Sequence, residues 1–274
     1  MKSIIVGTDF SKGSYVALDV AVDIANKMGT NIKLIWVRKD KSSSDEKDQT
    51  QRLAVDKMQS LCDEHAPRLH GTITYEVKYG AVADVLGEEA KKLNSPMIVI
   101  GTNGAKGYER YWRGSTACRI MLEAPCPTLT IREGFDFNRS LQNIVLPLRI
   151  NPYSRQKVPY AATMAKIFGS RVHILGLIEN VHSMGTLKSY LKQVEEFFAK
   201  EGIPFTCIGR RYENFTDSVL QYCSEIKGDM VVVNTEKQRL ITRLFLGTNA
   251  QQMVHHAQIP VYCIQPKEIG SIAR

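Results

Sequence analysis

The sequence predicts an α/β protein made of two similar halves, each with a parallel β-sheet flanked by helices. Short apolar segments, typical of buried strands, alternate along the chain with segments in which apolar residues recur at helical spacing. Such an order favours parallel strands joined by right-handed helical crossovers, with helices on both faces of the sheet. The order starts again after residue 140, so we expect an internal repeat.

The first half opens with an apolar strand at residues 3–8, followed by a helix at residues 11–28. One face of this helix gathers small and aliphatic side chains, namely Ala17, Ala21, Ile24, Ala25 and Met28. A second apolar strand follows at residues 31–37. The polar stretch KDKSSSDEKD (residues 39–48) predicts a loop. The next helix is expected at residues 50–65, where one face carries Ala54, Met58, Leu61 and Cys62.

The remaining elements continue the alternation in both halves. In the first half they are strands at residues 71–78, 96–100 and 127–132 and helices at residues 82–93 and 115–123. In the second half, strands are expected at residues 143–148, 171–177, 203–208, 229–233 and 260–264. The helix expected at residues 186–199 is strongly apolar on one face, through Leu187, Leu191, Val194 and Phe198.

An offset of 133 residues aligns part of the two halves without a gap. It pairs identical residues: Met97 with Met230, Val99 with Val232, Thr102 with Thr235, Arg110 with Arg243, Gly114 with Gly247, Ala124 with Ala257 and Pro127 with Pro260. Chance does not readily give so many identities, which supports a repeat. The boundary is placed in the segment GFDFNRS, so we expect one domain at residues 1–138 and a second at residues 139–274.

Length and composition limit the class of protein. The 274 residues are 43% hydrophobic and 23% charged, which suits two globular domains with cores of their own. No apolar run approaches the roughly 18 residues that a membrane span needs, and the stretch MKSIIVGTDF lacks the pattern of a signal peptide. Six cysteines without a CxxC pair suit buried thiols in a reducing compartment, so we expect a cytoplasmic protein. The net charge of +8 permits an anionic ligand, but its spread along the chain does not favour nucleic acid.

The stretch IGTNGAKGYERYWRGST (residues 100–116) follows a predicted buried strand and is rich in glycine. In an open parallel sheet, ligands bind at the carboxyl ends of the strands, where the strand order reverses. Glycines let backbone N–H groups approach a ligand, and the helix expected to start at Gly114–Ser115 adds N–H donors and partial positive charge. Formal positive charge comes from Lys106, Arg110 and Arg113. The stretch therefore suits an oligophosphate, while a flexible loop with a Gly-Ser helix cap is the alternative.

Two common phosphate signatures are missing from the sequence, the GxxxxGK[ST] loop and a GxGxxG after the first strand. The spacing is instead G-x2-G-x9-G-S, at Gly101, Gly104, Gly114 and Ser115. This spacing resembles the nucleotide-binding motif of the universal stress protein family. The resemblance covers most of residues 1–133, through IIVGTDFSKGSYVALDVAVDIA, LIWV, YGAVADVLGEEAKKLNSPMIVIGTNG and APCPTLTI. Residues 141–266 resemble the family more weakly, so the whole chain is similar to a tandem member.

The resemblance implies a flavodoxin/Rossmann-like fold with five parallel strands in each half, and ATP in the first half with Mg²⁺ bridging its phosphates. By position, Asp9 and the backbone of Thr8 would flank the adenosine, and Val37 would contact the adenine. Ribose and phosphates would be held by Gly101, Asn103, Gly104, Gly114, Ser115 and Thr116. A carboxylate is tolerable beside the hydroxyls and amine of adenosine, although it would repel a triphosphate without a metal. Two other roles stay open, Asp9 as a helix N-cap and Val37 as a core residue.

The second half departs from this motif. Arg149 aligns with Asp9, Asn234 with Gly101 and Lys237 with Gly104, and a helix start remains at Gly247 and Thr248. A side chain at position 237 would obstruct phosphate, so we expect no ATP here. The expected role is structural, although a different ligand stays open. The resemblance implies that the fifth strands, PTLTIRE and PVYCIQP, pair to form an intramolecular pseudo-dimer, and we expect a homodimer of such pseudo-dimers.

The sequence shows no clear catalytic apparatus beside the glycine motif. Phosphoryl transfer needs a metal clamp, a positioned nucleophile and charge stabilisation, and no obvious base other than Asp9 adjoins the motif. Adjacent helical residues point about 100° apart, so His255 and His256 do not favour a shared metal site. Three functions stay open: an ATP-binding stress or regulatory protein with little turnover, a slow ATPase, and a nucleotide-free dimeric adaptor.

Overall fold

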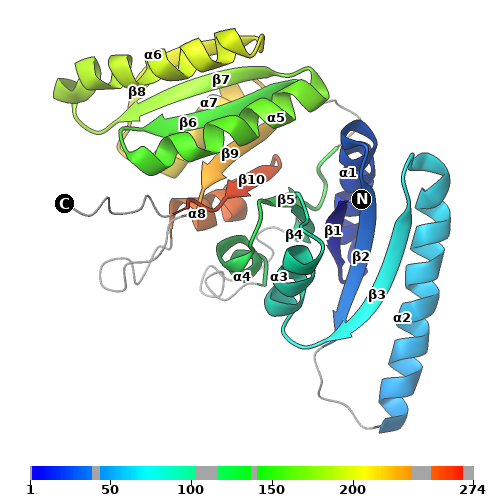
Figure 1. Ribbon diagram of the computed structural model, residues 1–274. Helices are drawn as coiled ribbons and strands as arrows, with labels where there is room; N and C mark the ends of the chain where they lie inside the picture. The colour runs from blue at the N-terminus through cyan, green and yellow to red at the C-terminus, as the bar shows by residue number, and fades with distance from the viewer. Residues whose placement is uncertain (1, 39–43, 103–115, 137–140, 236–247, 268–274) are drawn as a thin grey trace, which may run out of the picture. The chain divides into compact units, whose positions relative to one another are not determined.

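The computed structural model describes residues 2–38, 44–102, 116–136, 141–235 and 248–267. The chain divides into two compact units, Met1–Phe137 and Asn138–Arg274 (Figure 1). Each unit is an α/β domain with a parallel sheet, which confirms the fold class predicted from the sequence. In the described part of the chain, no helix is both long enough and apolar enough to cross a membrane.

The first unit contains a five-stranded parallel sheet with the strand order β3-β2-β1-β4-β5. The chain proceeds from β1 outward through β2 and β3, and then returns to the other side of β1 with β4, so the strand order reverses between β1 and β4. The elements are β1 (Ser3–Thr8), α1 (Lys12–Met28), β2 (Asn31–Arg38), α2 (Ser44–His65), β3 (Ile73–Tyr79), α3 (Val82–Lys92), β4 (Ile98–Thr102), α4 (Thr116–Glu123) and β5 (Thr128–Arg132).

Helices cover both faces of this sheet. Asp19 of α1 contacts His65, the last residue of α2, on one face, while α3 and α4 pack side by side on the other (Figure 1). Between α3, α4 and the sheet lies a core cluster that includes Ile5, Ile35, Leu86, Ile98 and Ile120. Because both faces are covered, the central strands are continuous apolar runs rather than alternating ones, which made them visible in the sequence.

The helix α2 corrects one expectation. The segment at residues 39–48 was expected to be a loop, but α2 begins at Ser44, within that segment, instead of at residue 50. Polarity alone does not prevent a helix, because charged and polar residues have ordinary helix propensities and need no buried face at a helix end. The buried face begins at Ala54 and Met58, as the sequence predicts.

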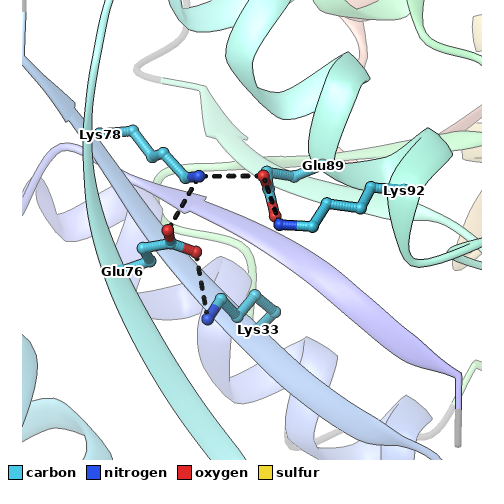
Figure 2. Close-up of polar contacts among 5 residues, drawn as sticks. All are labelled: Lys33, Glu76, Lys78, Glu89 and Lys92. Atoms are coloured by element: carbon cyan, nitrogen blue, oxygen red, sulfur yellow. Dashed lines mark hydrogen bonds and ion pairs between the residues drawn. The ribbon is translucent and has the colours of Figure 1, made fainter.

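A chain of ion pairs ties the edge strand β3 to α3 and β2 (Figure 2). The Glu76 carboxylate contacts Lys33 Nζ at 3.2 Å and Lys78 Nζ at 2.8 Å. Lys78 Nζ also lies 3.0 Å from Oε1 of Glu89, which is 7% exposed, and Lys92 Nζ lies 3.6 Å from the same oxygen. The Lys78 ammonium, followed by Lys33, lowers the pKa of Glu76. The network therefore fixes the outer strand beneath α3.

The second unit repeats the arrangement, with the strand order β8-β7-β6-β9-β10 and all strands parallel. The predicted apolar face of α6 is confirmed, because Leu187, Leu191, Val194 and Phe198 are buried. The elements are β6 (Asn143–Arg149), the 3-10 helix η3 (Pro152–Lys157), α5 (Val158–Phe168), β7 (Arg171–Ile178), α6 (Met184–Lys200), β8 (Phe205–Arg211), α7 (Phe215–Glu225), β9 (Met230–Asn234), α8 (Asn249–His256) and β10 (Val261–Ile264).

The units differ at their first helix. In the first unit, α1 runs without a break from Lys12, whereas the equivalent stretch of the second unit is η3 followed by α5. Pro159 has no N–H to donate to a carbonyl four residues earlier, so an α-helix cannot continue normally through this point. The N-cap Asn151 accepts a hydrogen bond from Ser154 N at 2.8 Å and fixes the start of η3.

Candidate functional site

Four of the residues singled out from the sequence meet at the carboxyl edge of the first sheet. The β1–β2 register places Thr8 opposite Trp36, so Asp9 comes next to Val37. The β1–β4 register pairs Gly7 with Ile100, which brings Thr8 next to Gly101. These ends flank the place where the strand order reverses, which is where open α/β sheets bind ligands.

Asp9 is exposed, and its carboxylate is held by the turn that leads into α1. Oδ1 accepts a hydrogen bond from Ser11 N at 3.0 Å. The N-cap of α1 is Ser11, whose Oγ accepts from Ser14 N at 3.2 Å, so the alternative of Asp9 as the cap is wrong. Asp9 instead forms an Asx-type turn one step earlier. Within the described residues, the Asp9 oxygen Oδ2 has no hydrogen-bond partner.

The turn depends on Phe10, which the sequence reasoning did not single out. Phe10 has φ of 60°, an unusual left-handed conformation for an aromatic residue. Thr8 Oγ1 accepts from Phe10 N at 3.1 Å, and the Phe10 ring stacks on Trp36 with centroids 5.9 Å apart. Lys57 Nζ lies 5.2 Å from the Phe10 ring centroid. These contacts hold Phe10 inward, while Asp9 remains exposed.

Gly101 has a packing reason that is independent of any ligand. A Cβ placed at this residue would lie 2.3 Å from the carbonyl carbon of Gly13 and 2.4 Å from Ser14 N. Real Cβ contacts are not this short, so β4 and the first turn of α1 can approach each other only if residue 101 is glycine. The buried hydroxyls of Thr8 and Ser14, 3.0 Å apart, fasten the same turn to β1.

Val37 and Thr116 lie at the same end of the first unit in different settings. Val37 is half-buried and packs on the core cluster beneath α3, so its position fits the alternative role of a core residue. Thr116 is exposed at the first residue of α4. The other predicted phosphate ligands, Asn103, Gly104, Gly114 and Ser115, lie outside the described residues, as do the basic residues Lys106, Arg110 and Arg113.

The second unit presents a different surface at the equivalent edge. Arg149 ends β6, and its guanidinium carbon lies 4.7 Å from the Phe215 ring centroid. At the end of β9, Asn234 Oδ1 accepts from Lys157 Nζ at 2.9 Å. Positive and amide groups thus stand where the first unit has a carboxylate and a glycine.

The helix that follows also differs between the units. In the second unit, α8 is closed by a capping box: Thr248 Oγ1 accepts from Gln251 N at 3.3 Å, and Gln251 Oε1 accepts from Thr248 N at 2.8 Å. Two N–H donors of that helix start are therefore already used. The residue of the first unit that aligns with Gln251 is Cys118, which cannot supply such an acceptor.

Titratable groups elsewhere do not form a metal or thiol centre in the described residues. No group of three or more His, Cys, Asp or Glu side chains there is arranged to hold a metal ion. His255 and His256 have ring centroids 4.7 Å apart, edge to face. Burial raises the pKa of Cys62 to about 11 and the pKa of Cys126, Cys207 and Cys223 to about 12, so these thiols stay protonated at neutral pH.

Taken together, the fold and the edge of the first sheet define a tandem α/β protein of the Rossmann-like type, with a turn-held carboxylate at the strand reversal of the first unit. Comparison with protein families makes this more specific. The Universal stress protein family matches the chain twice, over residues 1–132 and 140–265. The chain therefore belongs to the universal stress protein family, and the repeat predicted from the sequence is a repeat of that domain.

Individual relatives agree with this assignment. A curated relative, Universal stress protein MJ0531 of Methanocaldococcus jannaschii, is 28% identical over 145 residues, which cover 48% of this chain and 82% of the relative. A universal stress protein structure from Archaeoglobus fulgidus covers 96% of this chain and 98% of its own, with a TM-score of 0.80 and 16% identity. A putative universal stress protein from Pseudomonas aeruginosa covers 97% and 94%, with a TM-score of 0.67 and 14% identity. At these identities the two structures show the shared fold alone.

Proposed function

We propose that the first unit binds ATP at the carboxyl ends of β1, β2 and β4, and that the protein is a nucleotide-dependent regulatory protein with little or no turnover. The observation that carries this proposal is the exposed Asp9 carboxylate, held by Ser11 N at the strand reversal. One oxygen orders the turn, which leaves the other to accept from a hydroxyl or the amine of adenosine. Because Phe10 is anchored on Trp36, this acceptor is positioned before a ligand arrives.

The phosphates are assigned to the glycine motif and the start of α4. Support comes from the contrast with the second unit, where a capping box uses two N–H donors of α8. In the first unit Cys118 stands in place of that glutamine, so the same capping box cannot form there, and Mg²⁺ could bridge phosphates held at this helix start. We include in this proposal a cytoplasmic location and a homodimer of intramolecular pseudo-dimers.

The absence of turnover is argued from the chemistry around Asp9. In the described residues, the nearby hydroxyls of Thr8 and Ser14 bond to each other in the interior, so neither is placed to activate water. Asp9 supplies the carboxylate beside the strand reversal in the described residues, and we assign to it the role of binding adenosine. Bound ATP would then act by favouring one conformation of the protein over another.

Calorimetry on ligand-stripped protein with ATP and Mg²⁺ tests the proposal. Asp9→Asn keeps an oxygen to accept from Ser11 N but removes the charge, and we expect it to weaken ATP binding by about tenfold. Asp63→Asn is the matched control, because Asp63 is exposed on α2 and bonds to Gln59. No heat at millimolar ATP, with no nucleotide released from the freshly purified protein in mass spectrometry, would favour the nucleotide-free adaptor.

Two further measurements separate the remaining alternatives. Gly114→Val is expected to abolish ATP binding and Gly247→Val to leave it intact, provided both variants are folded, because only the first unit is assigned phosphates. Product analysis over time on metal-replete protein measures turnover. Multiple turnovers per minute would replace the regulatory function by a slow ATPase.

A further inference from the structure

We propose that mild acid opens the outer strand of the second unit, β8, through protonation of His173 on the neighbouring strand β7. The two strands pair in parallel, and β8 is the last strand on that side of the sheet of the second unit. Edge strands have few neighbours and open at low cost in free energy. The inference does not depend on ATP binding by the first unit, because the contacts of His173 lie within the second unit.

The ring of His173 joins three strands and is bonded as a neutral imidazole. Nε2 lies 3.0 Å from Asn143 Oδ1 on β6, and Nδ1 lies 3.0 Å from Thr206 Oγ1 on β8. The amide oxygen can only accept, so Nε2 carries the proton, and Nδ1 of the neutral ring accepts from the Thr206 hydroxyl. His173 is only 8% exposed. A second proton, on Nδ1, would therefore bury a positive charge and turn the Thr206 hydroxyl away from the ring.

The first unit shows what a positive charge at this position requires. Lys33 of β2 and His173 of β7 occupy the same place in the two sheets, because each is the third residue of its strand and lies opposite a threonine of the outer strand. The Lys33 ammonium lies 3.2 Å from the carboxylate of Glu76 on β3 (Figure 2). At the position of Glu76, β8 has Ile208. The second unit thus keeps a side chain that can carry a positive charge but lacks the carboxylate that would offset it.

The second carboxylate of the first-unit network is also replaced. Glu89 is the eighth residue of α3, and the eighth residue of α7 is Tyr222. The Tyr222 ring lies edge to face with His173, with ring centroids 6.4 Å apart. The guanidinium carbon of Arg210 lies 5.0 Å from the Tyr222 ring centroid, and both guanidinium ends donate to Glu225. The carboxylate that α7 contributes near this ring is therefore already paired with a cation of β8.

Two other charged groups act on the His173 ring, Arg171 on the same strand and Asp229 just before β9. Burial, followed by the Arg171 charge, lowers the pKa of His173, and Asp229 opposes this shift. Asp229 Oδ2 accepts from Gln142 N at 3.0 Å and from Asn143 N at 2.8 Å, so the carboxylate is held at these backbone groups. The stability that depends on neutral His173 is therefore complete above pH 6.5, and it is lost as the pH falls from there toward the lower folded-state pKa.

Hydrogen exchange of the intact protein from about pH 7.5 to about pH 5 measures the opening of β8, after correction for the pH dependence of intrinsic exchange. We expect the opening equilibrium of Phe205–Arg211 to rise as the pH falls below 6.5, by up to about tenfold per pH unit, the limit for uptake of one proton. The strand β3 of the first unit is the internal reference. The Lys78 ammonium, followed by Lys33, lowers the pKa of Glu76, so that network stays charged in this range.

Two pairs of variants separate protonation of His173 from a general effect of acid. His173→Gln keeps a polar side chain without the titration, and its β8 should no longer open as the pH falls. His182→Gln, at an exposed histidine of the same unit, is the matched control and should open like the parent. Ile208→Glu restores a carboxylate at the position of Glu76 and should suppress the opening, whereas the uncharged Ile208→Gln should not. This second pair leaves His173 in place, so it decides the question even if His173→Gln does not fold.

An NMR titration of the imidazole protons measures the pKa of His173 directly, with the resonance assigned as the one missing from His173→Gln. We expect a pKa below 6.5 in the parent and a higher pKa in Ile208→Glu. A pKa at or above 6.5 in the parent would overturn the proposal, and so would acid opening of β8 that is equal in the parent and His173→Gln. Both measurements are made without nucleotide, so they stand or fall separately from ATP binding.

Discussion

Replacing Gly101 by alanine tests whether β4 and α1 need a glycine between them. The added Cβ would lie 2.3 Å from the Gly13 carbonyl carbon and 2.4 Å from both Gly13 O and Ser14 N. Ordinary van der Waals contact begins at 3.4 Å, so the first turn of α1 must move by roughly 1 Å. The atoms in the way belong to the backbone, and therefore no side-chain rotation can relieve the contact.

The expected loss of stability is about 2–3 kcal/mol, the upper part of the range for overpacking a well-packed interior. Gly87→Ala is a control with the opposite expected sign. Gly87 lies inside α3, and a Cβ there meets only Pro125 Cδ at 3.8 Å. Since alanine is the better helix former, this variant should be more stable by about 0.5–1 kcal/mol.

Urea unfolding of ligand-stripped protein, followed by tryptophan fluorescence, measures both effects in the intact chain. The two tryptophans, Trp36 and Trp112, both belong to the first half, so the signal reports the unit that carries the substitution. Unchanged stability of Gly101→Ala would refute the packing argument. If Gly101→Ala kept its stability but lost ATP binding, the glycine would be needed for close approach of the ligand and not for packing.

Three other perturbations have defined outcomes. The Asp19 carboxylate raises the pKa of buried His65 above 6.5. The stabilisation from this contact is therefore complete below pH 6.5 and is lost as the pH rises through the higher folded-state pKa. Urea midpoints should fall over that pH range, and Asp19→Asn should remove this pH dependence. Glu89→Gln should cost about 1–2 kcal/mol in the same urea assay, because it removes the buried charge between Lys78 and Lys92, whereas the exposed Glu88→Gln should stay within about 0.5 kcal/mol. Gln251→Ala should lower the hydrogen-exchange protection of α8 by about 1 kcal/mol and leave ATP affinity unchanged; weaker ATP binding would contradict the assignment of the nucleotide to the first unit.

The fold was accessible from the sequence because both faces of each sheet are covered. Strands such as β1 and β9 are then short, continuous apolar runs, which stand out between amphipathic helices. The start of α2 was not accessible, because its first residues are polar on all sides and carry no periodic signal. The tertiary structure decides such boundaries, since the helix is anchored further on, at Ala54 and Met58.

The candidate site was predictable only in part. The place of Asp9 follows from its position after β1, but the choice of Ser11 as N-cap over Asp9 depends on the backbone conformation of Phe10. A left-handed aromatic residue has no local sequence signal, because its strain is offset by contact with Trp36, which lies far from it along the chain. The Lys157–Asn234 bond spans 77 positions and likewise has no local signal.

The repeat itself explains why the two units need not bind the same ligand. Both units keep the strand order that places β1 or β6 at the reversal, and hence both keep an edge suited to binding. What differs is the supply of donors and charge at that edge. In the first unit, a carboxylate is exposed and α4 lacks the capping glutamine, which suits a ligand with hydroxyls at one end and phosphates at the other. In the second unit, Gln251 uses the donors of α8, while Lys157 and the Asn234 amide add donors elsewhere. The two units therefore present different groups at equivalent edges, so a ligand that suits the first edge need not suit the second.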